Sequence, residues 1–307
     1  MPNRKEVKVE MITIITPSYN QGRFIRETIE SVLSQGVPSI EYIVMDGGSK
    51  DETITILEEY SDRLYWESKA DGGQADAVNQ GILKASGDII GWLNSDDLYY
   101  PGTLQMVQKV FDENPQISVL YGNAHHIAED GGIIEEYPTE DYSFKRLVET
   151  CIICQPSLFF RKALTEKFGL LNSSLQYCMD YEYWIRLAKK VPFMRVDSFF
   201  AASRLYQENK TLGSRRKVHE EIAQMFKTQL GKTPDCWIYN LAHVICDEEG
   251  IPRTVAGETN PTYAARLTTL TKQVFRQYTG RVPISAYSML HQWKRIGQKE
   301  VRHENRV

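Results

Sequence analysis

The residues of this 307-residue chain best suited to chemistry are two adjacent carboxylates, Asp96 and Asp97, in the segment Asn94–Asp97. They follow an apolar run, where neighbouring carboxylates are costly to place without a countercharge. A divalent hard cation such as Mg²⁺ or Mn²⁺ supplies that charge, and it completes its shell with substrate phosphates and water. The pair therefore suits a metal-bound diphosphate. The competing interpretation is an N-cap for the helix that follows Pro101.

A second acidic segment, Met179–Leu187, has Asp180 at the head of a predicted amphipathic helix. A carboxylate at that position can act as a general base, can cap the helix, or can do both. Glu182 is the fallback base. It projects about 200° around the helix from Asp180, so we do not expect the two to share the task. Trp184 is either core packing or a floor for stacking, and we favour the core.

Both acidic segments need elements that carry them to one place. The strands predicted in the N-terminal half cover residues 11–16, 40–45, 64–67 and 89–93. The helices predicted there cover residues 23–34, 51–60 and 74–85, and another begins near Pro101. This alternation indicates an α/β fold with a mostly parallel sheet flanked by helices. Ligands of such sheets bind at the carboxyl ends of the strands, so we expect the four polar loops there to open onto one edge.

The pattern becomes mixed after about residue 120. Strands are predicted over residues 117–121, 133–137 and 157–160, and helices over 180–190 and 215–229. The turn-rich stretch 247–252 marks a boundary, and residues 260–307 are predicted to be helical and basic. We therefore expect a large domain over residues 1–250 and a helical C-terminal extension over residues 251–307.

Composition narrows the class of protein. Lys and Arg number 36 and Asp and Glu number 40, and the net charge of −4 makes the chain a poor candidate for nucleic-acid binding. No apolar run of about 18 residues predicts a transmembrane helix, and the first residues lack the apolar segment of a signal peptide. We therefore interpret the five cysteines, including the closely spaced Cys151 and Cys154, as reduced thiols of a cytoplasmic protein.

Four polar segments at the ends of the predicted strands resemble, in order and in place, motifs of the family 2 glycosyltransferases. They are Thr16–Asn20, Val44–Asp51, Gly72–Gly81 and Asn94–Asp97. The resemblance covers roughly residues 10–215. It implies the GT-A fold, with the nucleotide sugar at about residues 10–120 and the acceptor at about residues 120–215. It also implies an inverting, metal-dependent glycosyltransferase that moves a sugar from a nucleotide-diphosphate donor to a hydroxyl of a glycan or glycolipid, in polysaccharide or glycolipid assembly.

The resemblance implies roles for particular residues. Asp97 would hold the metal on the donor diphosphate, and Asp96 would reach the ribose or share the metal. The residues that would line the base and ribose pocket are Thr16, Pro17 and Tyr19, with Asp46 at the nucleotide end. The chain departs from the family at Gly47, where many members carry a second acidic residue that can contact the base. Gly47 cannot make that contact, so the resemblance does not secure a uridine donor.

The segment after the third strand would meet the donor as well. Backbone N–H groups at Gly73 suit sugar or diphosphate oxygens, and the alternative is a plain strand–helix turn. Asp76 would face the donor sugar, and Asn79 matches a helix position of the family motif. Arg204 resembles the arginine of an Arg-x-His segment that contacts the diphosphate or metal, with Tyr206 in place of the histidine. A solvated salt bridge is the alternative for Arg204.

Asp180 aligns with the catalytic base of the family, although Met179 stands where glutamate is usual. A carboxylate there would take the proton of the acceptor hydroxyl as the hydroxyl attacks.

Two other functions stay open. A sugar nucleotidyltransferase would need a basic Gly-rich loop after the first strand, and Pro17–Gly22 has no basic residue before Arg23. A domain that binds a nucleotide sugar or glycan without turnover would lack the metal carboxylate or the base. The basic extension is expected to be a solvated helical face. Its lesser interpretation is peripheral contact with the inner face of a membrane, or with a partner.

Overall fold

The structure, a computed structural model, describes residues 10–38, 40–207 and 213–304, with side chains up to residue 296. The chain divides into two compact units, Met1–Gln207 and Glu208–Val307. Among the described helices, none combines the length and apolar character needed to cross a membrane.

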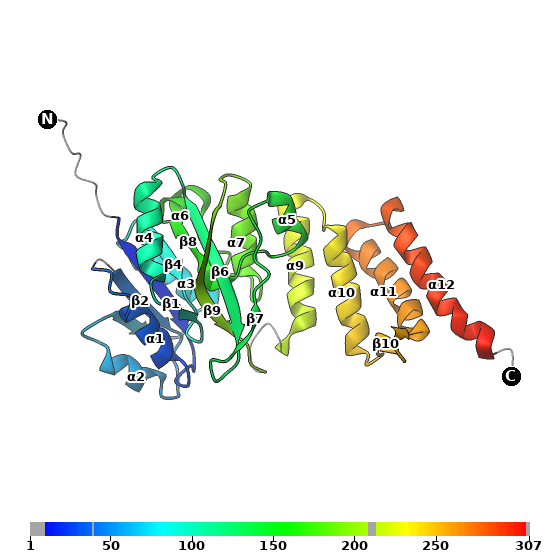
Figure 1. Ribbon diagram of the computed structural model, residues 1–307, viewed down its shortest axis with the longest axis horizontal. Helices are drawn as coiled ribbons and strands as arrows, with labels where there is room; N and C mark the ends of the chain where they lie inside the picture. The colour runs from blue at the N-terminus through cyan, green and yellow to red at the C-terminus, as the bar shows by residue number, and fades with distance from the viewer. Residues whose placement is uncertain (1–9, 39, 208–212, 305–307) are drawn as a thin grey trace. The chain divides into compact units, whose positions relative to one another are not determined.

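The first unit is built on one sheet of nine strands in the order β3-β2-β1-β4-β8-β6-β9-β5, with β7 paired to β6 (Figure 1). The strands are β1 (Ile12–Ser18), β2 (Ile40–Asp46), β3 (Tyr65–Ser68), β4 (Ile89–Trp92), β5 (Leu98–Tyr99), β6 (Val119–Ile127), β7 (Ile133–Glu136), β8 (Leu158–Arg161) and β9 (Met194–Arg204). The four strands predicted in the N-terminal half are therefore confirmed.

Strands β3, β2, β1 and β4 run parallel to one another. Their carboxyl ends consequently meet at one edge, as the alternation of strands and helices predicts. The other half of the sheet is mixed, since β8 is antiparallel to β4 and β6, whereas β6 and β9 are parallel. The parallel part of the sheet is thus the half that carries the four polar motifs.

Helices cover both faces of the sheet. They are α1 (Ile25–Leu33), α2 (Thr53–Glu59), α3 (Gln74–Lys84), α4 (Thr103–Glu113), α5 (Phe144–Glu149), α6 (Ala163–Phe168) and α7 (Met179–Ala188), and the short 3₁₀ helix η1 (Gln155–Ser157) precedes β8. Ile12 and Ile14 of β1 join a core shared with α1, α2 and α4. The alternate residue Ile15 faces α3. Every residue of β1 is buried, because a parallel strand inside such a sheet is covered on both faces.

Several elements of this unit were not predicted from the sequence. Strand β9 was missed because Arg195 and Asp197 interrupt the apolar pattern of its first half, which is only partly buried. Strand β5 has two residues, and helices α5 and α6 have six each, so no periodicity can develop in them. Trp184 is 1% exposed and packs near Phe160 and Tyr183, which confirms its predicted place in the core.

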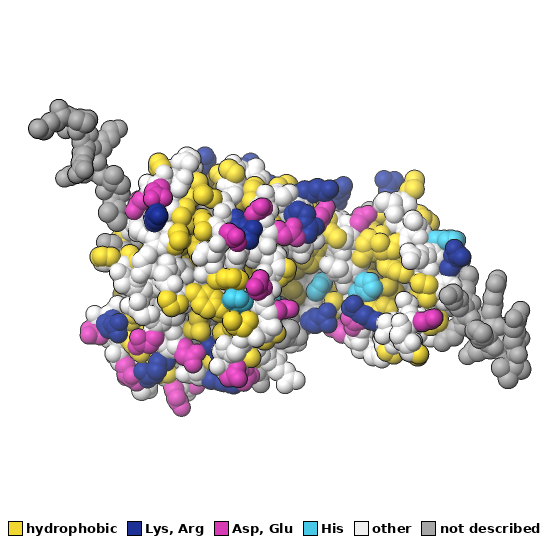
Figure 2. All heavy atoms as spheres, viewed as in Figure 1, with side chains coloured by type: hydrophobic (Ala, Val, Ile, Leu, Met, Phe, Trp, Pro, Cys, Tyr) yellow, Lys and Arg dark blue, Asp and Glu magenta, His cyan; other side chains and the backbone are white. Residues whose placement is uncertain are grey.

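Charges of both signs lie interspersed at the surface. Figure 2 shows Lys and Arg side chains among Asp and Glu side chains on the visible face. Some are paired, as Arg146 is with Glu140 at 2.6 Å and Arg195 is with Asp141 at 2.9 Å. Exposed pairs of this kind contribute little because water and salt screen them, so the stability of the unit depends mainly on its buried core.

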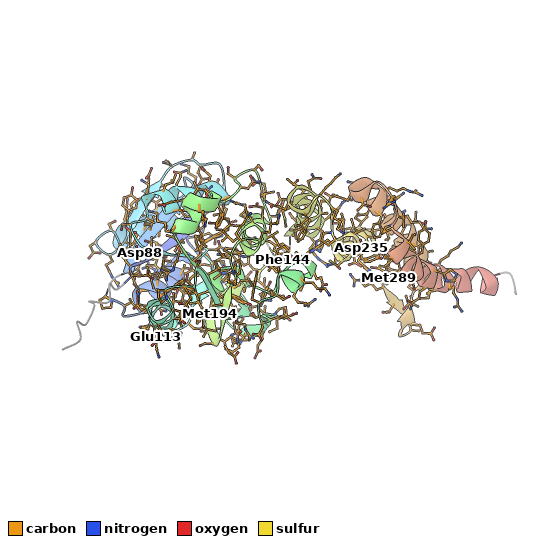
Figure 3. The ribbon with its side chains drawn as sticks, turned by 90° about the horizontal axis from the view of Figure 1, so that it is seen from above. Asp88, Glu113, Phe144, Met194, Asp235 and Met289 are labelled. Atoms are coloured by element: carbon orange, nitrogen blue, oxygen red, sulfur yellow. The ribbon has the colours of Figure 1, made fainter. Side chains whose placement is uncertain are left out.

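The second unit is helical, with α9 (Arg215–Leu230), α10 (Asp235–Glu248), α11 (Pro261–Thr279), the 3₁₀ helix η2 (Ile284–Ala286) and α12 (Tyr287–Glu304). Figure 3 labels Asp235 on α10 and Met289 on α12. Helices α9, α10, α11 and α12 share one core, to which each contributes, in order, Ala223, Leu241, Phe275 and Leu290. A hairpin of β10 (Thr254–Val255) and β11 (Glu258–Thr259) lies between α10 and α11. Helices α11 and α12 confirm the prediction of helix after residue 260.

The compact units divide between Gln207 and Glu208, ahead of the boundary expected at residues 250/251. The turn-rich stretch 247–252 instead begins in the last two residues of α10 and leads towards α11, and these two helices pack in one core. Asp247 of this stretch forms an ion pair with Arg253, just beyond the stretch, at 2.6 Å. The division of the chain into functional parts at residue 250 stays a prediction.

Gly81 of α3 tests how closely this helix packs on β1. A Cβ atom at position 81 would lie 2.4 Å from Cγ2 of Ile15, which is fully buried. Gly81→Ala is therefore expected to lower the free energy of unfolding by about 1–3 kcal/mol, measured by chemical denaturation. This loss outweighs the preference of helices for alanine over glycine, which is about 1 kcal/mol.

The control for this measurement is Leu83→Ala on the same helix. Leu83 is 70% exposed, and its substitution should change the free energy of unfolding by no more than about 0.5 kcal/mol. A Gly81→Ala protein as stable as the native chain would contradict the close packing of α3 on β1.

Candidate active site

The loops after β1 and β2 are joined at the carboxyl edge of the sheet. The backbone N–H of Asn20 donates to Ser49 Oγ at 2.7 Å, and Asn20 Oδ1 accepts the N–H of Lys50 at 2.8 Å. The N–H of Gln21 donates to Thr53 Oγ1 at 2.9 Å. Asn20 has a φ of 52°, a region that asparagine enters more readily than most residues. These hydrogen bonds give the edge a fixed shape.

The side-chain amide of Asn94 connects several segments at this edge. Its Nδ2 donates to Asp97 Oδ2 at 3.1 Å and to Gln155 Oε1 at 2.9 Å. Its Oδ1 accepts from Gln74 Nε2 at 2.7 Å and from Trp92 Nε1 at 2.9 Å. Both donors and both lone pairs of the amide are therefore used. Asn94 thereby holds the start of α3 and the turn η1 against the acidic pair.

Asp97 is the buried member of the acidic pair, with 3% of its surface exposed. Its Oδ1 accepts the backbone N–H of Arg204, at the end of β9, at 2.9 Å. Its backbone carbonyl accepts the hydroxyl of Thr28 from α1 at 2.9 Å. Burial, and then the charge of Asp96, raise the pKa of Asp97 well above its usual range. Asp97 thus joins the end of β4 to β9 and α1 while its own charge is destabilised.

Asp96 is the less buried member of the pair. Its Oδ2 accepts the hydroxyl of Tyr206 at 2.8 Å, and that hydroxyl accepts Nε2 of Gln21 at 3.2 Å. Burial raises the pKa of Asp96, although the hydrogen bond from Tyr206 opposes the shift. The tyrosine that stands in place of the family's histidine therefore contacts the acidic pair directly.

The acidic pair has the chemistry of a divalent cation site. Burial raises the pKa of both carboxyls and Asp96 adds repulsion at Asp97, so a cation beside the pair would relieve a destabilised charge. Within the described ranges, no group of three or more His, Cys, Asp or Glu side chains could hold a metal. A cation here would need further oxygens from water or a bound phosphate, as Mg²⁺ and Mn²⁺ commonly do.

Asp180 lies in the first turn of α7, and the segment before this helix meets the start of α3, where a Cβ atom at Gly73 would lie 3.7 Å from Gln176 Oε1. Burial is the main cause that raises the pKa of the Cys154 thiol well above its usual value, and Asp97, Cys151 and Asp180 add to the shift in that order. The pKa of Cys151 is raised to about 12, mainly by burial and next by Asp180.

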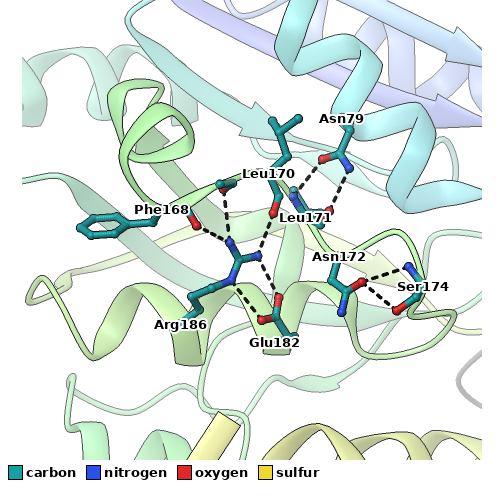
Figure 4. Close-up of polar contacts among 9 residues, drawn as sticks. Asn79, Phe168, Leu170, Leu171, Asn172, Ser174, Glu182 and Arg186 are labelled. Carbon is teal, nitrogen blue, oxygen red and sulfur yellow. Dashed lines mark hydrogen bonds and ion pairs between the residues drawn. The ribbon is translucent and has the colours of Figure 1, made fainter. Parts of the chain in front are cut away.

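Glu182, the fallback base, serves the fold instead. It is 4% exposed, and its two oxygens accept from Arg186 at 2.9 and 3.0 Å (Figure 4). Arg186 also donates to the carbonyls of Phe168 and Leu170 at 2.6 and 2.8 Å. The pair ties α7 to the segment after α6, so the Glu182 carboxylate is already engaged and is poorly suited to take a proton from a substrate.

Asn79 also has a structural role, which corrects its predicted contact with the donor. Its Nδ2 donates to the carbonyl of Leu171 at 2.9 Å, and its Oδ1 accepts the N–H of the same residue at 2.9 Å (Figure 4). The residue is 9% exposed. Asn79 therefore joins α3 to the segment that leads to α7, because two opposed hydrogen bonds fix that backbone.

The side chain of Arg204 is completely buried, which corrects its predicted contact with the diphosphate. Its guanidinium donates to the carbonyls of Asp96 at 3.0 Å and Ala128 at 3.3 Å. It also pairs with Glu27 at 2.7 Å and lies 4.7 Å from the ring centre of Phe24. These contacts hold β9 against α1 and the acidic pair, so Arg204 positions the site.

Among the residues predicted to line the base pocket, Tyr19 is the exposed one, at 61%. Thr16 is completely buried, with its hydroxyl 3.1 Å from that of Tyr42. Pro17 is buried within β1, and Asp46 is 2% exposed. The side chains of Thr16 and Pro17 thus build the strand that positions Tyr19, and the lining of a base pocket by these residues stays a prediction.

Gly73 and Asp76, at the start of α3, stay candidates for donor binding. Gly73 has a φ of 102°, which glycine tolerates, and a Cβ atom there would lie 3.7 Å from Gln176 Oε1. Asp76 Oδ2 accepts the N–H of Gly72 at 2.9 Å, which fixes the turn ahead of the helix. The glycine turn thus brings the start of α3 close to the segment that precedes Asp180.

The sequence analysis overlooked the side-chain amides that connect the site. Gln74 and Gln155 bind Asn94, and Gln21 binds Tyr206. The sequence could have indicated Gln74 as a site residue, since it directly follows Gly73 in one of the four motifs. No sequence feature indicates Gln155, because its partner Asn94 lies 61 residues away in the chain and no spacing rule links the two.

The raised pKa values predict how the stability of the metal-free protein depends on pH. An aspartate in the unfolded chain has a pKa of about 3.9. Between that pH and the higher folded values, the folded state binds more protons, so its stability falls as the pH rises. Asp96→Asn removes one charge and keeps an acceptor for Tyr206. Thermal denaturation in EDTA should show a flatter decline with pH and a higher Tm at neutral pH.

The exposed variant Asp62→Asn is the control and should follow the native pH dependence. A lower Tm of Asp96→Asn than of the native chain at neutral pH in EDTA would contradict the destabilised charge at this pair.

Comparison of the chain with known proteins shows which family it is similar to. The sequence model described as "Glycosyl transferase family 2" matches residues 13–169. An uncharacterized glycosyltransferase of Rickettsia prowazekii is 28% identical over 247 residues, which are 76% of this chain and 72% of that protein. The chondroitin synthase of Escherichia coli is 27% identical over 233 residues, 73% of this chain and 34% of that protein. The chain therefore spans about a third of that synthase.

Two solved structures share the fold. Staphylococcus aureus TarS 1–349, in complex with UDP-GlcNAc, has a TM-score of 0.62 at 18% identity, over 94% of this chain and 88% of that one. The mannosyltransferase PcManGT of Pyrobaculum calidifontis, in complex with GDP-Man and Mn²⁺, has a TM-score of 0.57 at 15% identity, over 95% and 86%. The predicted GT-A fold is confirmed. With the family motifs at one sheet edge and the family match over residues 13–169, the chain belongs to the family 2 glycosyltransferases.

Proposed function

We propose that the chain is an inverting glycosyltransferase that moves a sugar from a nucleotide-diphosphate donor to a hydroxyl group of a glycan or glycolipid. The observation that carries the proposal is the chain of contacts at the carboxyl edge: Asn94 binds both Asp97 and Gln74 at the start of α3, and Gly73 there lies beside Gln176, in the segment that leads to Asp180. A donor diphosphate at the acidic pair would lie near a carboxylate carried by a different element. Charge stabilisation and proton acceptance are the two functions that such a transfer requires.

The donor site in this proposal is assembled from the loops at the carboxyl edge. Tyr19 offers an exposed ring to the base or ribose, and Gly73 and Asp76 would face the sugar or the diphosphate. Solved structures with this fold contain UDP-GlcNAc or GDP-Man, and the sequence relatives include chondroitin and hyaluronan synthases. These proteins support a nucleotide-sugar donor and a role in glycan assembly.

The metal assignment follows the accessibility of the acidic pair. We assign direct contact with Mg²⁺ or Mn²⁺ to Asp96, and we place Asp97, the ligand expected from the sequence, behind it. The reason is that Asp97 is more buried and its oxygens accept from the Arg204 N–H and from Asn94. The hydroxyl of Tyr206 would orient Asp96. A bound cation would offset the negative charge that develops on the leaving diphosphate.

Asp180 is the proposed general base. Its carboxylate would accept the proton of the acceptor hydroxyl while that oxygen attacks the anomeric carbon. The bond to the diphosphate would break on the opposite face of the sugar, so the configuration would invert without a covalent intermediate. The first turn of α7 suits this role, because the positive end of the helix dipole favours the ionised carboxylate.

Nucleotidyl transfer is less well supported. Arg23, the first basic residue after β1, pairs with Glu129 and lies 4.7 Å from the ring centre of Phe24. A loop that cradles a triphosphate needs basic side chains directed at the phosphates, and Arg23 is directed elsewhere.

Peripheral membrane contact through residues 251–307 stays a prediction. In the described part of this segment, Arg253 pairs with Asp247 at 2.6 Å and Arg266 pairs with Glu249 at 2.5 Å. Pairing reduces the positive charge available to anionic headgroups. These contacts favour the solvated helical face over the membrane interpretation.

Nucleotide binding tests the donor site. By calorimetry, the chain should bind at least one of UDP, GDP, CDP and dTDP in the presence of Mn²⁺, and EDTA should weaken that binding by about tenfold or more, since the cation links the diphosphate to Asp96. Asp96→Asn should remove the effect of the metal, and Asp62→Asn should keep it. If none of the four nucleotides binds with or without Mn²⁺, the donor site is wrong.

Substitution of the base tests the reaction. Asp180→Asn should lower kcat by about 10²–10⁴-fold and leave the Kd for the nucleotide unchanged, because asparagine cannot accept the proton. Release of the nucleotide from a donor sugar in the presence of oligosaccharide acceptors measures kcat.

The matched variant is Glu182→Gln, which removes the other carboxylate of this helix turn. It should lower the free energy of unfolding by about 1–3 kcal/mol, because Arg186 loses a charged partner, and it should retain most of kcat where the protein is folded. A folded Glu182→Gln protein without turnover, beside an active Asp180→Asn protein, would move the base to Glu182.

A further inference from the structure

We propose that Asp71 reads the nucleobase of the donor and selects uracil, thymine or guanine over cytosine and adenine. The inference rests on the proposed function, since it concerns the nucleotide of the same donor. It gives the loop between β3 and α3 the base-reading carboxylate that the family resemblance would lead one to expect after β2.

Asp46, the carboxylate at the end of β2, is already engaged. Asp46 is 2% exposed, and its Oδ2 accepts the N–H groups of Gly48 and Ser49 at 2.9 Å each and the hydroxyl of Ser68 at 2.6 Å. Its Oδ1 accepts the Ser49 hydroxyl at 2.5 Å. Four donors meet this one carboxylate, so Asp46 shapes its own turn and joins that turn to β3.

The absence of a side chain at Gly47 leaves a small space beside the backbone, and the Asp71 carboxylate borders that space. A Cβ atom at position 47 would lie 3.2 and 3.4 Å from Oδ2 and Oδ1 of Asp71, and 3.3 Å from Cδ2 of Tyr19. The two loops are held together here, since the N–H of Lys69 donates to the carbonyl of Asp46 at 3.0 Å. The Asp71 carboxylate therefore lies where a side chain of residue 47 would begin.

One carboxylate oxygen of Asp71 accepts a hydrogen bond within the protein, and the other is available to a ligand. Its Oδ1 accepts the N–H of Gly73 at 2.8 Å, and this local turn fixes the orientation of the carboxylate. Its Oδ2 has no hydrogen-bond partner among the residues that the structure describes, and it is the oxygen nearer to the space at Gly47. Asp71 is half-buried, so a ligand at this edge can reach that oxygen.

The ring of Tyr19 completes the site. It is 61% exposed and borders the same space at Gly47. An exposed aromatic ring beside an acceptor oxygen suits a flat nucleobase, whose face meets the ring and whose edge meets the carboxylate. Stacking accepts every base, because every base has a π-face. Selection between bases must therefore come from the contact with the carboxylate.

An ionised carboxylate accepts hydrogen bonds and donates none. Uracil, thymine and guanine present an N–H group at the centre of their pairing edge, which Asp71 Oδ2 can accept. Cytosine and adenine present a nitrogen lone pair at that place, which the carboxylate repels. Hydrogen-bond polarity at one oxygen thus separates the two classes of base.

The first test is calorimetric binding of UDP, dTDP, GDP, CDP and ADP, each with Mn²⁺, to the full chain and to Asp71→Asn. The native chain should bind at least one of UDP, dTDP and GDP about tenfold or more tightly than CDP and ADP, which is the effect of one hydrogen bond to a charged group. In Asp71→Asn, Oδ1 can keep the Gly73 N–H while an amide donor replaces Oδ2. The variant should lose about tenfold in affinity for the preferred nucleotide and gain affinity for CDP or ADP.

A second pair of variants separates the carboxylate from the loop that carries it. Asp71→Ala should lose the preference, and Asp71→Ala/Gly47→Asp should restore part of it by supplying a carboxylate from the neighbouring loop. Gly47 is outside the left-handed region, and Asp71→Ala removes two of the three atoms closest to a new Cβ. The third, Tyr19 Cδ2 at 3.3 Å, belongs to an exposed ring that can shift, so the second substitution can be accommodated.

Glu67→Gln on β3 is the matched control. Its carboxylate pairs with Lys69 and Lys84 at 2.8 and 2.9 Å, so the variant removes a charge from the same region and should keep the native order of nucleotides.

The outcomes distinguish this inference from the proposed function. If the native chain binds CDP or ADP best, or if Asp71→Asn keeps the native order, Asp71 does not read the base while the donor site stands. If the native chain binds no nucleotide with or without Mn²⁺, the proposed function fails and the inference fails with it. A new order in Asp71→Asn together with the native order in Glu67→Gln supports the inference.

Discussion

The candidate site depends on the fully hydrogen-bonded amide of Asn94. Its two donors and two lone pairs hold Gln74, Trp92, Asp97 and Gln155 in one arrangement. A partly buried amide in which every hydrogen bond is made is held in one orientation, because each displacement breaks several hydrogen bonds at once. The ends of β4, the start of α3 and the turn before β8 therefore keep one geometry, and that geometry sets the surroundings of the acidic pair.

The acidic pair shows how stability and function oppose each other in this fold. Asp97 is buried beside Asp96, and its raised pKa means that the folded, ligand-free chain disfavours its charge. The structure compensates with the backbone N–H of Arg204 and the amide of Asn94. In the proposed function, a cation beside the pair would offset the remaining unfavourable charge.

The motifs of the sequence meet at one edge of the sheet, but they contain two kinds of residue. Arg204 and Asn79 lie in or near the motifs and hold backbone segments in place. Tyr19 and Asp71 are more accessible and carry atoms that a ligand can reach. Both kinds are polar, so residue type alone cannot separate them. Burial separates them, because a polar side chain inside the protein must bond to the protein itself.

Much of the fold can be predicted from the sequence, because each strand and the loop after it form one contiguous sequence pattern. The strands β1 to β4 appear as apolar runs followed by polar loops, and parallel pairing then places those loops at one edge. Strand β9 and the boundary near Gln207 were not accessible in this way. The first half of the strand is only partly buried and its second half mostly buried, so no alternation marks it. The boundary follows from which helices share a core, which is a long-range property.

The sequence by itself therefore determined the class of fold, the edge at which the site forms and the acidic residues that mark it. Only the tertiary structure decided which carboxylate serves which purpose: Asp46 and Glu182 are bound by their own surroundings, whereas Asp71 presents an oxygen to the edge. The physical reason is that the state of a carboxylate depends on the donors around it. In this chain, those donors come from segments that are far apart in sequence and meet only when the sheet has formed.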